Sequence, residues 1–289
     1  MARRLPPPTL DDAPLASGLY VVATPIGNLR DITLRALDVL AAADLVLAED
    51  TRVAGKLLSA YGLSAKLERY DEHGAERTRP RALAALAEGK RVALVSDAGT
   101  PLVSDPGYRI VRQAAAEGFP VFPVPGASAL LAGLSAAGLP SDRFLFAGFP
   151  PPKSAARRTF LEELAPLRAT LVFFEGGSRL AASLADMAAV FGPREGVVCR
   201  ELTKLYETIV RGPLTDLAID PRFEAPKGEL VILVGPGQET VASATDVDTA
   251  LADALERLRP AEAAAEVAKA LGLSRRDVYQ RAMQMRAGR

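Results

Sequence analysis

The apolar residues of the chain follow two alternating spacings. Short runs of consecutive apolar residues predict buried strands, and stretches with apolar residues every three or four positions predict helices. Because the strands are apolar throughout and alternate with helices, the pattern predicts an α/β fold with a parallel sheet covered on both faces. In the first half we expect strands at 19–24, 45–48, 91–96 and 121–124, and helices at 31–43, 51–61, 76–88, 106–117 and 127–137.

A change of composition separates the first half from the second. The segment 138–153 contains Pro140, three consecutive prolines at 150–152 and three phenylalanines, and we place a domain boundary there. The alternation then resumes, and turn signals around residues 212 and 227 favour antiparallel neighbours. We expect helices at 155–167 and 179–191, and strands at 170–174, 197–201, 207–211 and 228–234.

The last fifty residues differ from both halves. Small and polar residues at 237–246 predict a linker, and three short helices are expected at 247–258, 261–271 and 274–286. The predicted organisation is therefore a flexible lead-in at 1–17, an N-terminal α/β domain at 18–138, a linker at 139–152, a second α/β domain at 153–237, and a helical basic tail at 238–289 that resembles a helix-turn-helix.

Composition excludes several kinds of chemistry. The 35 basic and 35 acidic residues balance, so the chain is not coated with positive charge. With one cysteine, Cys199, and one histidine, His73, it cannot form an internal disulfide or an ordinary zinc site. His73 lies in a polar run and is expected in a loop. No apolar stretch approaches the ~20 residues of a membrane span, and we expect a soluble cytoplasmic protein without membrane attachment.

Four loops that follow predicted strands have unusual compositions. In α/β sheets, ligands bind at the carboxyl ends of the strands, which is where these loops lie. They are rich in glycine, contain several acidic residues, have no lysine and do not match the P-loop pattern. Such a cleft suits a neutral or cationic cofactor that carries a nucleoside better than a polyphosphate. The loops span residues 23–28, 96–107, 123–128 and 173–179.

Several stretches of the chain resemble a known family. The sequence is similar to the tetrapyrrole-methylase superfamily, and within it to the bacterial 16S rRNA (cytidine-2′-O)-methyltransferases. The similarity runs from about residue 18 to 235, and the helical tail also fits. It rests on LYVVATPIGNL at 19–29, DITLRA at 31–36, AEDTR at 48–52, VSDAGTPLVSDPG at 95–107, VPGAS at 124–128, GLPSDRFLFAGF at 138–149, RELTK at 200–204 and KGELV at 227–231.

The resemblance implies both a fold and an activity. The fold would be that of the two-domain class III methyltransferases, with a small helical C-terminal domain. The activity would be methylation of the 2′-hydroxyl of a cytidine in the decoding region of 16S rRNA, with S-adenosylmethionine as methyl donor and no metal. The cofactor contacts carried over are Pro25, Ile26, Gly27, Asp97, Ala98, Gly99, Thr100, Ser104, Ser128, Ala129, Phe174, Glu175, Glu229 and Leu230. Ser178 stands where the family has a histidine, so no role of that imidazole is transferred.

The proton of the 2′-hydroxyl must leave during the reaction, which calls for a general base. Glu49, Asp50 and Arg52 follow the second predicted strand and are candidate catalytic residues, with Lys204 as a further charged candidate. Other interpretations stay open. The acidic pair is also favourable at the start of a helix, and Lys204 could belong to an ion-pair network. Asp97 could equally cap the helix that follows it.

The tail bears on the substrate. From Lys269 to the C-terminus it holds six basic residues and one acidic residue. Arg275, Arg276 and Arg281 are candidate contacts to RNA phosphates, which position RNA without reading its sequence. These charges and the motif AEDTR favour RNA as substrate, and the resemblance implies the small ribosomal subunit and its 16S rRNA as partner. Two other functions remain open, a tetrapyrrole methyltransferase and a non-catalytic RNA-binding module. Assembly into a homodimer also remains open.

Overall fold

The structure is a computed structural model that describes residues 10, 14–72, 74–224, 226–237, 244–271 and 273–287. Most of the expected lead-in, His73 and residues 238–243 of the expected linker lie outside these residues. The contacts divide the chain into two units, residues 1–237 and residues 238–289, and each is described by itself.

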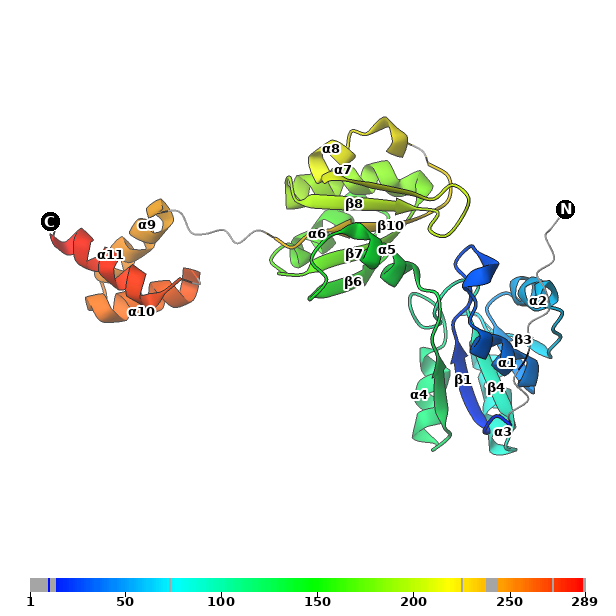
Figure 1. The fold of residues 1–289 in the computed structure, drawn as a ribbon. Helices are drawn as coiled ribbons and strands as arrows, with labels where there is room; N and C mark the ends of the chain where they lie inside the picture. Colours follow the sequence, from blue (N-terminus) through cyan, green and yellow to red (C-terminus); the bar gives the residue numbers. More distant parts are fainter. Residues whose placement is uncertain are drawn as a thin grey trace. The chain divides into compact units, whose positions relative to one another are not determined.

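The first sheet of the larger unit is entirely parallel, as the apolar runs predict. Its strand order is β3-β2-β4-β1-β5 (Figure 1). We did not expect β3, because it is short, contains a single apolar residue and is only partly buried. The strands are β1 (Gly18–Val22), β2 (Leu45–Ala48), β3 (Leu67–Arg69), β4 (Arg91–Val95) and β5 (Val121–Val124).

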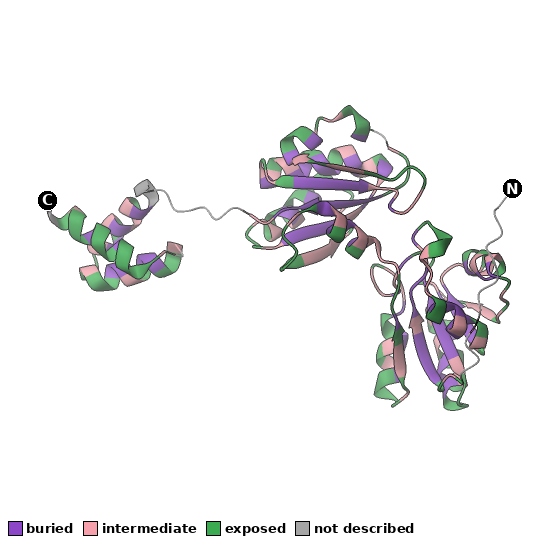
Figure 2. Cartoon of the chain, in the orientation of Figure 1, coloured by how far each residue is buried: buried purple, intermediate pink, exposed green. Residues whose placement is uncertain are grey.

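Helices cover both faces of this sheet. On one face, α1 (Leu34–Ala42) and α2 (Thr51–Ala60) bury their apolar stripes against the strands. On the other face, α3 (Ala75–Ala87) and α4 (Tyr108–Ala116) do the same. Colouring by burial shows the strands as the buried centre of this arrangement (Figure 2). A single turn of 3-10 helix, Leu29–Asp31, follows the loop after β1.

The second sheet is mixed. Its order is β6-β7-β10-β8-β9, in which β6 and β7 run parallel and the remaining neighbours are antiparallel. This confirms the antiparallel pairing expected from the turns around residues 212 and 227. The strands are β6 (Phe144–Gly148), β7 (Thr170–Gly176), β8 (Glu195–Arg200), β9 (Thr208–Pro213) and β10 (Glu229–Val234).

The transition between the two sheets differs from the expectation in two ways. Strand β6 lies within the segment 139–152, which we assigned to a linker because of its prolines. Helix α5 (Ala129–Ala137) precedes that segment but packs on the second sheet, against Val197, Val231 and Leu233. Gly133 lets the helix approach closely, since a Cβ there would lie 3.1 Å from Val231. The opposite face of the sheet is covered by α6 (Ser154–Leu164), α7 (Leu180–Phe191) and α8 (Leu214–Leu217).

The described residues of the smaller unit form three helices, close to the positions that the sequence predicts. They are α9 (Ala244–Leu255), α10 (Pro260–Leu271) and α11 (Arg275–Ala287). Leu251, Ala264, Val267 and Ala282 form part of a separate small core. Among the residues that the structure describes, no helix has the length and apolar character needed to cross a membrane.

Candidate active site

A cavity of about 450 Å³ lies where the loops of the first sheet meet the ends of strands in the second sheet. It falls in the size range of small-molecule sites. Fourteen of the residues singled out from the sequence line it: Ile26, Glu49, Asp97, Ala98, Gly99, Thr100, Ser104, Ser128, Ala129, Phe174, Glu175, Lys204, Glu229 and Leu230. Six further lining residues were not among the candidates from the sequence: Val103, Asp105, Phe149, Gly176, Leu202 and Val231.

The loops after β1, β4 and β5 are tied to one another. Thr24 and Gly99 exchange two backbone hydrogen bonds, of 2.8 and 3.0 Å, between the first loop and the second. The Thr100 hydroxyl donates to the carbonyl oxygen of Ala127 in the third loop, at 3.2 Å. These bonds hold three strand-end loops together along one side of the cavity, so the clustering that α/β topology predicts is present.

One side of the cavity is acidic. Glu49 follows β2, Asp97 and Asp105 lie in the loop after β4, and a carboxylate oxygen of Asp97 accepts a hydrogen bond from the backbone nitrogen of Asp50 at 3.0 Å. Burial raises the pKa of Glu49, and the neighbouring Asp97 raises it further. Burial and then the charge of Glu49 raise the pKa of Asp105 to about 6. A positive ligand charge would therefore be stabilised here.

The second domain contributes an apolar and aromatic group of residues to the cavity, beside the charged residues Glu175, Lys204 and Glu229. The ring of Phe174 contacts Phe146 and Phe149 edge-on, at centroid distances of 4.7 and 5.7 Å. Leu202, Leu230 and Val231 also belong to this group. Phe149 keeps 56% of its surface exposed although it lines the cavity, so its ring is open to a partner. Such a surface suits a flat ring such as a nucleobase.

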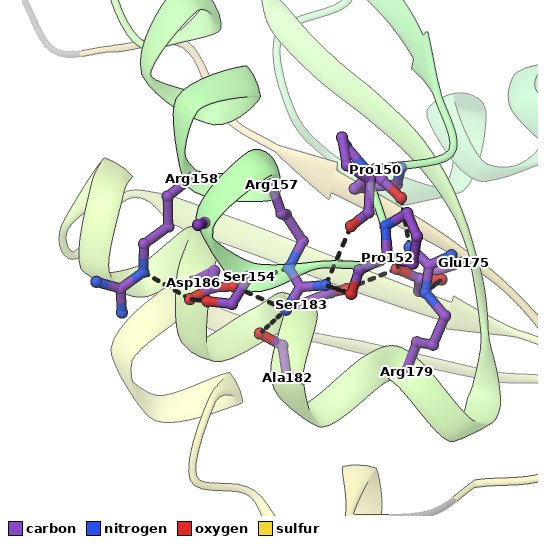
Figure 3. A network of polar contacts seen from close by, with 12 residues as sticks. Pro150, Pro152, Ser154, Arg157, Arg158, Glu175, Arg179, Ala182, Ser183 and Asp186 are labelled. Atoms are coloured by element: carbon purple, nitrogen blue, oxygen red, sulfur yellow. Dashed lines mark hydrogen bonds and ion pairs between the residues drawn. The ribbon is translucent and has the colours of Figure 1, made fainter.

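A buried polar network holds Glu175, the residue that follows Phe174 on β7 (Figure 3). The carboxylate accepts hydrogen bonds from the Ser183 hydroxyl at 2.5 Å and from the backbone nitrogen of Gly176 at 2.9 Å. Arg179 pairs with Glu175 and also donates to the carbonyl oxygen of Pro150, the residue after Phe149. The network thus links a cavity residue on β7 to the segment that carries Phe149.

A second part of the network centres on Arg157, of which 3% is exposed (Figure 3). Its guanidinium pairs with Asp186 on α7 at 2.7 Å and donates to the carbonyl oxygens of Pro151 and Pro152. Asp186 also accepts hydrogen bonds from Ser154 and Arg158. The ion pair therefore ties the proline segment to α7.

Two candidate bases from the sequence lie in surroundings that do not suit proton transfer. Asp50 does not line the cavity and instead caps the start of α2. Hydrogen bonds from Arg52 hold its pKa well below the usual range. Arg52 is also outside the cavity, with 85% of its side chain exposed. Lys204 does line the cavity. Burial lowers its pKa, but hydrogen bonds to Glu229 and Glu201 raise it overall, so it stays protonated.

Pro25 and Gly27 also lie outside the cavity lining. Gly27 still shapes the site, because a Cβ at this position would overlap the aliphatic stem of Lys204. Glycine lets the loop after β1 and the loop after β8 approach closely. Gly27 therefore packs against Lys204 and does not itself line the cavity.

The candidate RNA contacts on α11 fall into two groups. Arg275 and Arg276 are exposed, and no ion pair involves them among the residues that the structure describes. Arg281 instead forms a two-pronged ion pair with Asp248 on α9, at 2.5 and 2.6 Å. That pairing commits Arg281 to holding two helices together and makes it a poorer phosphate contact than its neighbours.

Comparison with known proteins agrees with this arrangement. A family model described as tetrapyrrole (corrin/porphyrin) methylases matches residues 18–218. The chain is 49% identical over 275 residues to ribosomal RNA small subunit methyltransferase I of Mesorhizobium japonicum, covering 94% of each chain. It is 53% identical to the protein of the same name from Erythrobacter litoralis, covering 94% of this chain and 97% of the relative. The chain belongs to the ribosomal RNA small subunit methyltransferase I family of tetrapyrrole methylases.

Two further matches agree with this family assignment. A model described as the RsmI C-terminal HTH domain matches residues 241–286. The crystal structure of uroporphyrin-III-C-methyltransferase from Thermus thermophilus is similar, with a TM-score of 0.54 and 25% identity, covering 76% of this chain and 94% of that chain. The protein is thus a methyltransferase, and its family implies S-adenosylmethionine as donor. Within the described part of the chain, no group of three or more His, Cys, Asp or Glu residues could hold a metal ion.

Proposed function

We propose that this protein transfers a methyl group from S-adenosylmethionine to the 2′-hydroxyl of a cytidine in the decoding region of 16S rRNA. The supporting observation is a cavity lined by both acidic and aromatic residues, in a chain about half identical to named rRNA methyltransferases. The protein acts in the cytoplasm, where its ribosomal substrate lies.

The cavity suits the donor in size and charge. The adenine ring would lie against Phe174 and Leu230 on the apolar side, while Asp97 accepts hydrogen bonds from amino or hydroxyl groups of the donor. Thr100 and Ser128 offer further hydroxyl groups at the same wall. The bound donor supplies a methyl group activated by a positively charged sulfur. Holding the two reactants in line is the main contribution of the protein, and it needs no metal.

The acidic side also offers the proton acceptor. Of the catalytic candidates from the sequence, Glu49 is a cavity carboxylate, burial raises its pKa, and its charge contributes to the acidic surroundings of the reacting hydroxyl. Lys204 would instead hold Glu229 and Glu201 in place beside the donor. Arg52 and Asp50 would stabilise the start of α2 beneath the acidic side.

The helical unit would bind RNA. Arg275 and Arg276 lie at the start of α11, exposed and available to phosphates, and Arg281 stabilises the unit through Asp248. The excess of positive charge on its last helix argues against the alternative of a tetrapyrrole methyltransferase, for which basic residues there have no evident use. The alternative draws its support from the shared fold with the uroporphyrin methyltransferase.

Replacing Asp97 with alanine tests the donor site. We expect wild-type protein to bind S-adenosylmethionine in calorimetry without added metal. The Asp97→Ala variant should bind about 10- to 100-fold more weakly, because a charge-assisted hydrogen bond is worth about 1.5–3 kcal/mol. Asp142→Asn removes an exposed carboxylate away from the cavity and should leave binding unchanged. Unchanged affinity in Asp97→Ala would remove Asp97 from the site, and no binding by wild-type protein would contradict the proposed function.

A further inference from the structure

Asp105 is a half-buried carboxylate that lies within the motif VSDAGTPLVSDPG but was not among the candidate site residues from the sequence. It lies on the loop between β4 and α4 and lines the same cavity as Glu49 and Asp97. We propose that Asp105 is the catalytic residue that accepts the proton of the 2′-hydroxyl during methyl transfer. This inference rests on the proposed function and adds to it the identity of the base.

The other charged groups of the cavity are committed elsewhere. Asp97 accepts a hydrogen bond from the backbone nitrogen of Asp50, and Lys204 is held between two carboxylates. Glu175 is fixed by Ser183, Arg179 and a backbone nitrogen. Glu49 accepts a hydrogen bond from the backbone of Asp97. Among the cavity carboxylates of the first sheet, Asp105 accepts no hydrogen bond from a backbone nitrogen in the described residues.

The backbone holds Asp105 in position. Leu102 and Ser104 adopt positive φ angles of 74° and 63°, which residues other than glycine rarely adopt, and Gly107 has a φ of 137°. A Cβ at Gly107 would lie 2.8 Å from the side chain of Leu94 in the core of the first sheet. Strained backbone of this kind is retained where a side chain must be aimed accurately. The carboxylate is thus presented by a constrained loop.

The charges around Asp105 match the task of a base at neutral pH. Burial contributes most to its raised pKa of about 6, followed by the negative charges of Glu49 and, more weakly, Asp97, while a hydrogen bond with Ser96 opposes the shift. Across the cavity, the second domain contributes Glu175, Glu229 and the protonated Lys204. A base whose pKa lies just below the working pH is mostly deprotonated and still takes up a proton effectively.

Methyl transfer to the 2′-oxygen is coupled to the loss of its proton. The 2′-hydroxyl gives its proton to a carboxylate oxygen of Asp105, while the 2′-oxygen uses a lone pair to form the new bond to the methyl carbon. The carbon–sulfur bond breaks, and its electron pair stays on sulfur, which becomes a neutral thioether. Asp105 then releases the proton to water. The rate should therefore rise with pH through the pKa of Asp105 and level off above it; that pKa is about 6 in the free protein, and the positive charge of the bound donor lowers it.

Single-turnover methylation of small ribosomal subunits tests this role. With donor and enzyme in excess, Asp105→Asn should lower the rate about 10²- to 10⁴-fold, the usual contribution of a general base, and should abolish the rise in rate with pH. Donor affinity, measured by calorimetry, should change far less than the rate. Asp105→Glu should recover part of the rate and keep the pH dependence, and Asp142→Asn serves as the unaffected control.

Stability against pH provides a readout that does not depend on activity. Because the folded pKa of Asp105 lies above its unfolded value, its contribution to stability is complete below about pH 4 and is lost as pH rises through 6. Asp105→Asn should therefore be more stable than wild type at pH 7.5, and this advantage should shrink toward pH 4. If the stability of the two proteins depended on pH in the same way, the pKa of Asp105 would not be raised in the folded protein, which would contradict its role as the base.

The outcomes separate the possible failures. A wild-type rate and pH profile in Asp105→Asn would overturn the role of Asp105. A donor affinity that falls as much as the rate would make Asp105 a donor contact and would also overturn it. Loss of the pH dependence in Glu49→Gln but not in Asp105→Asn would give the role to Glu49. Wild-type protein that does not methylate small subunits would overturn the proposed function itself, together with the role of Asp105.

Discussion

Replacing Arg157 with methionine should lower the free energy of unfolding by about 3–5 kcal/mol, because it leaves Asp186 buried without its main partner. Of the two residues, 3% and 4% are exposed, so water cannot replace the lost interaction. The carbonyl oxygens of Pro151 and Pro152 lose their donor in the same variant. Urea titration followed by circular dichroism measures the change.

Arg158 provides the matched control. It pairs with the same carboxylate at 2.7 Å, but 52% of its side chain is exposed. An ion pair with an exposed partner is worth about 1 kcal/mol or less, so Arg158→Met should have a small effect. In the double variant Arg157→Met with Asp186→Leu, part of the loss should be recovered, since no unpaired charge is then buried. Equal, small losses in Arg157→Met and Arg158→Met would show that the network does not stabilise the second domain.

Truncation after Gly237 should weaken RNA binding about tenfold or more and make it less sensitive to salt. The helical unit has its own core, and the chain divides into two compact units at residue 237, so the larger unit should stay folded and bind donor normally. Each phosphate contact that is lost removes about 0.7–0.9 from the slope of log affinity against log salt concentration. Fluorescence anisotropy with a 16S rRNA fragment measures both quantities.

Point variants identify which arginines matter. Arg275→Ala and Arg276→Ala should each weaken RNA binding and reduce the salt slope, with less effect than truncation and no change in the nucleotide modified. Arg281→Ala should act mainly on the stability of the helical unit, because its partner is Asp248. RNA affinity and salt slope that survive truncation would show that the helical unit is not an RNA-binding element.

Much of the arrangement follows from the sequence. Apolar runs separated by helical patterns predict the parallel first sheet, and the strand-end loops meet because parallel strands place their carboxyl ends at one edge. Loops 96–107 and 123–128 therefore line one cavity, and Thr100 bonds to Ala127. Turn residues around 212 and 227 predict the antiparallel strands of the second sheet.

The remaining features depend on contacts between distant residues. Strand β6 is an edge strand inside a proline-rich segment, so local composition conceals it. Several ion pairs depend on side-chain positions that no spacing rule specifies. They join Asp50 to Arg52, Lys204 to Glu201 and Glu229, and Arg281 to Asp248. Asp105 was hidden for the same reason, since its burial beside Glu49 arises only when β2 and β4 are neighbours.

Mapping 2′-O-methylated nucleotides in 16S rRNA tests the central claim most directly. Ribosomal RNA from a strain that lacks this gene, digested and analysed by mass spectrometry, should lack one 2′-O-methylated cytidine of the decoding region. The wild-type gene should restore that nucleotide, and the Asp97→Ala variant should restore it poorly. An identical set of methylated nucleotides with and without the gene would contradict the account, and methyl transfer by the purified protein to a porphyrinoid instead would favour the tetrapyrrole alternative.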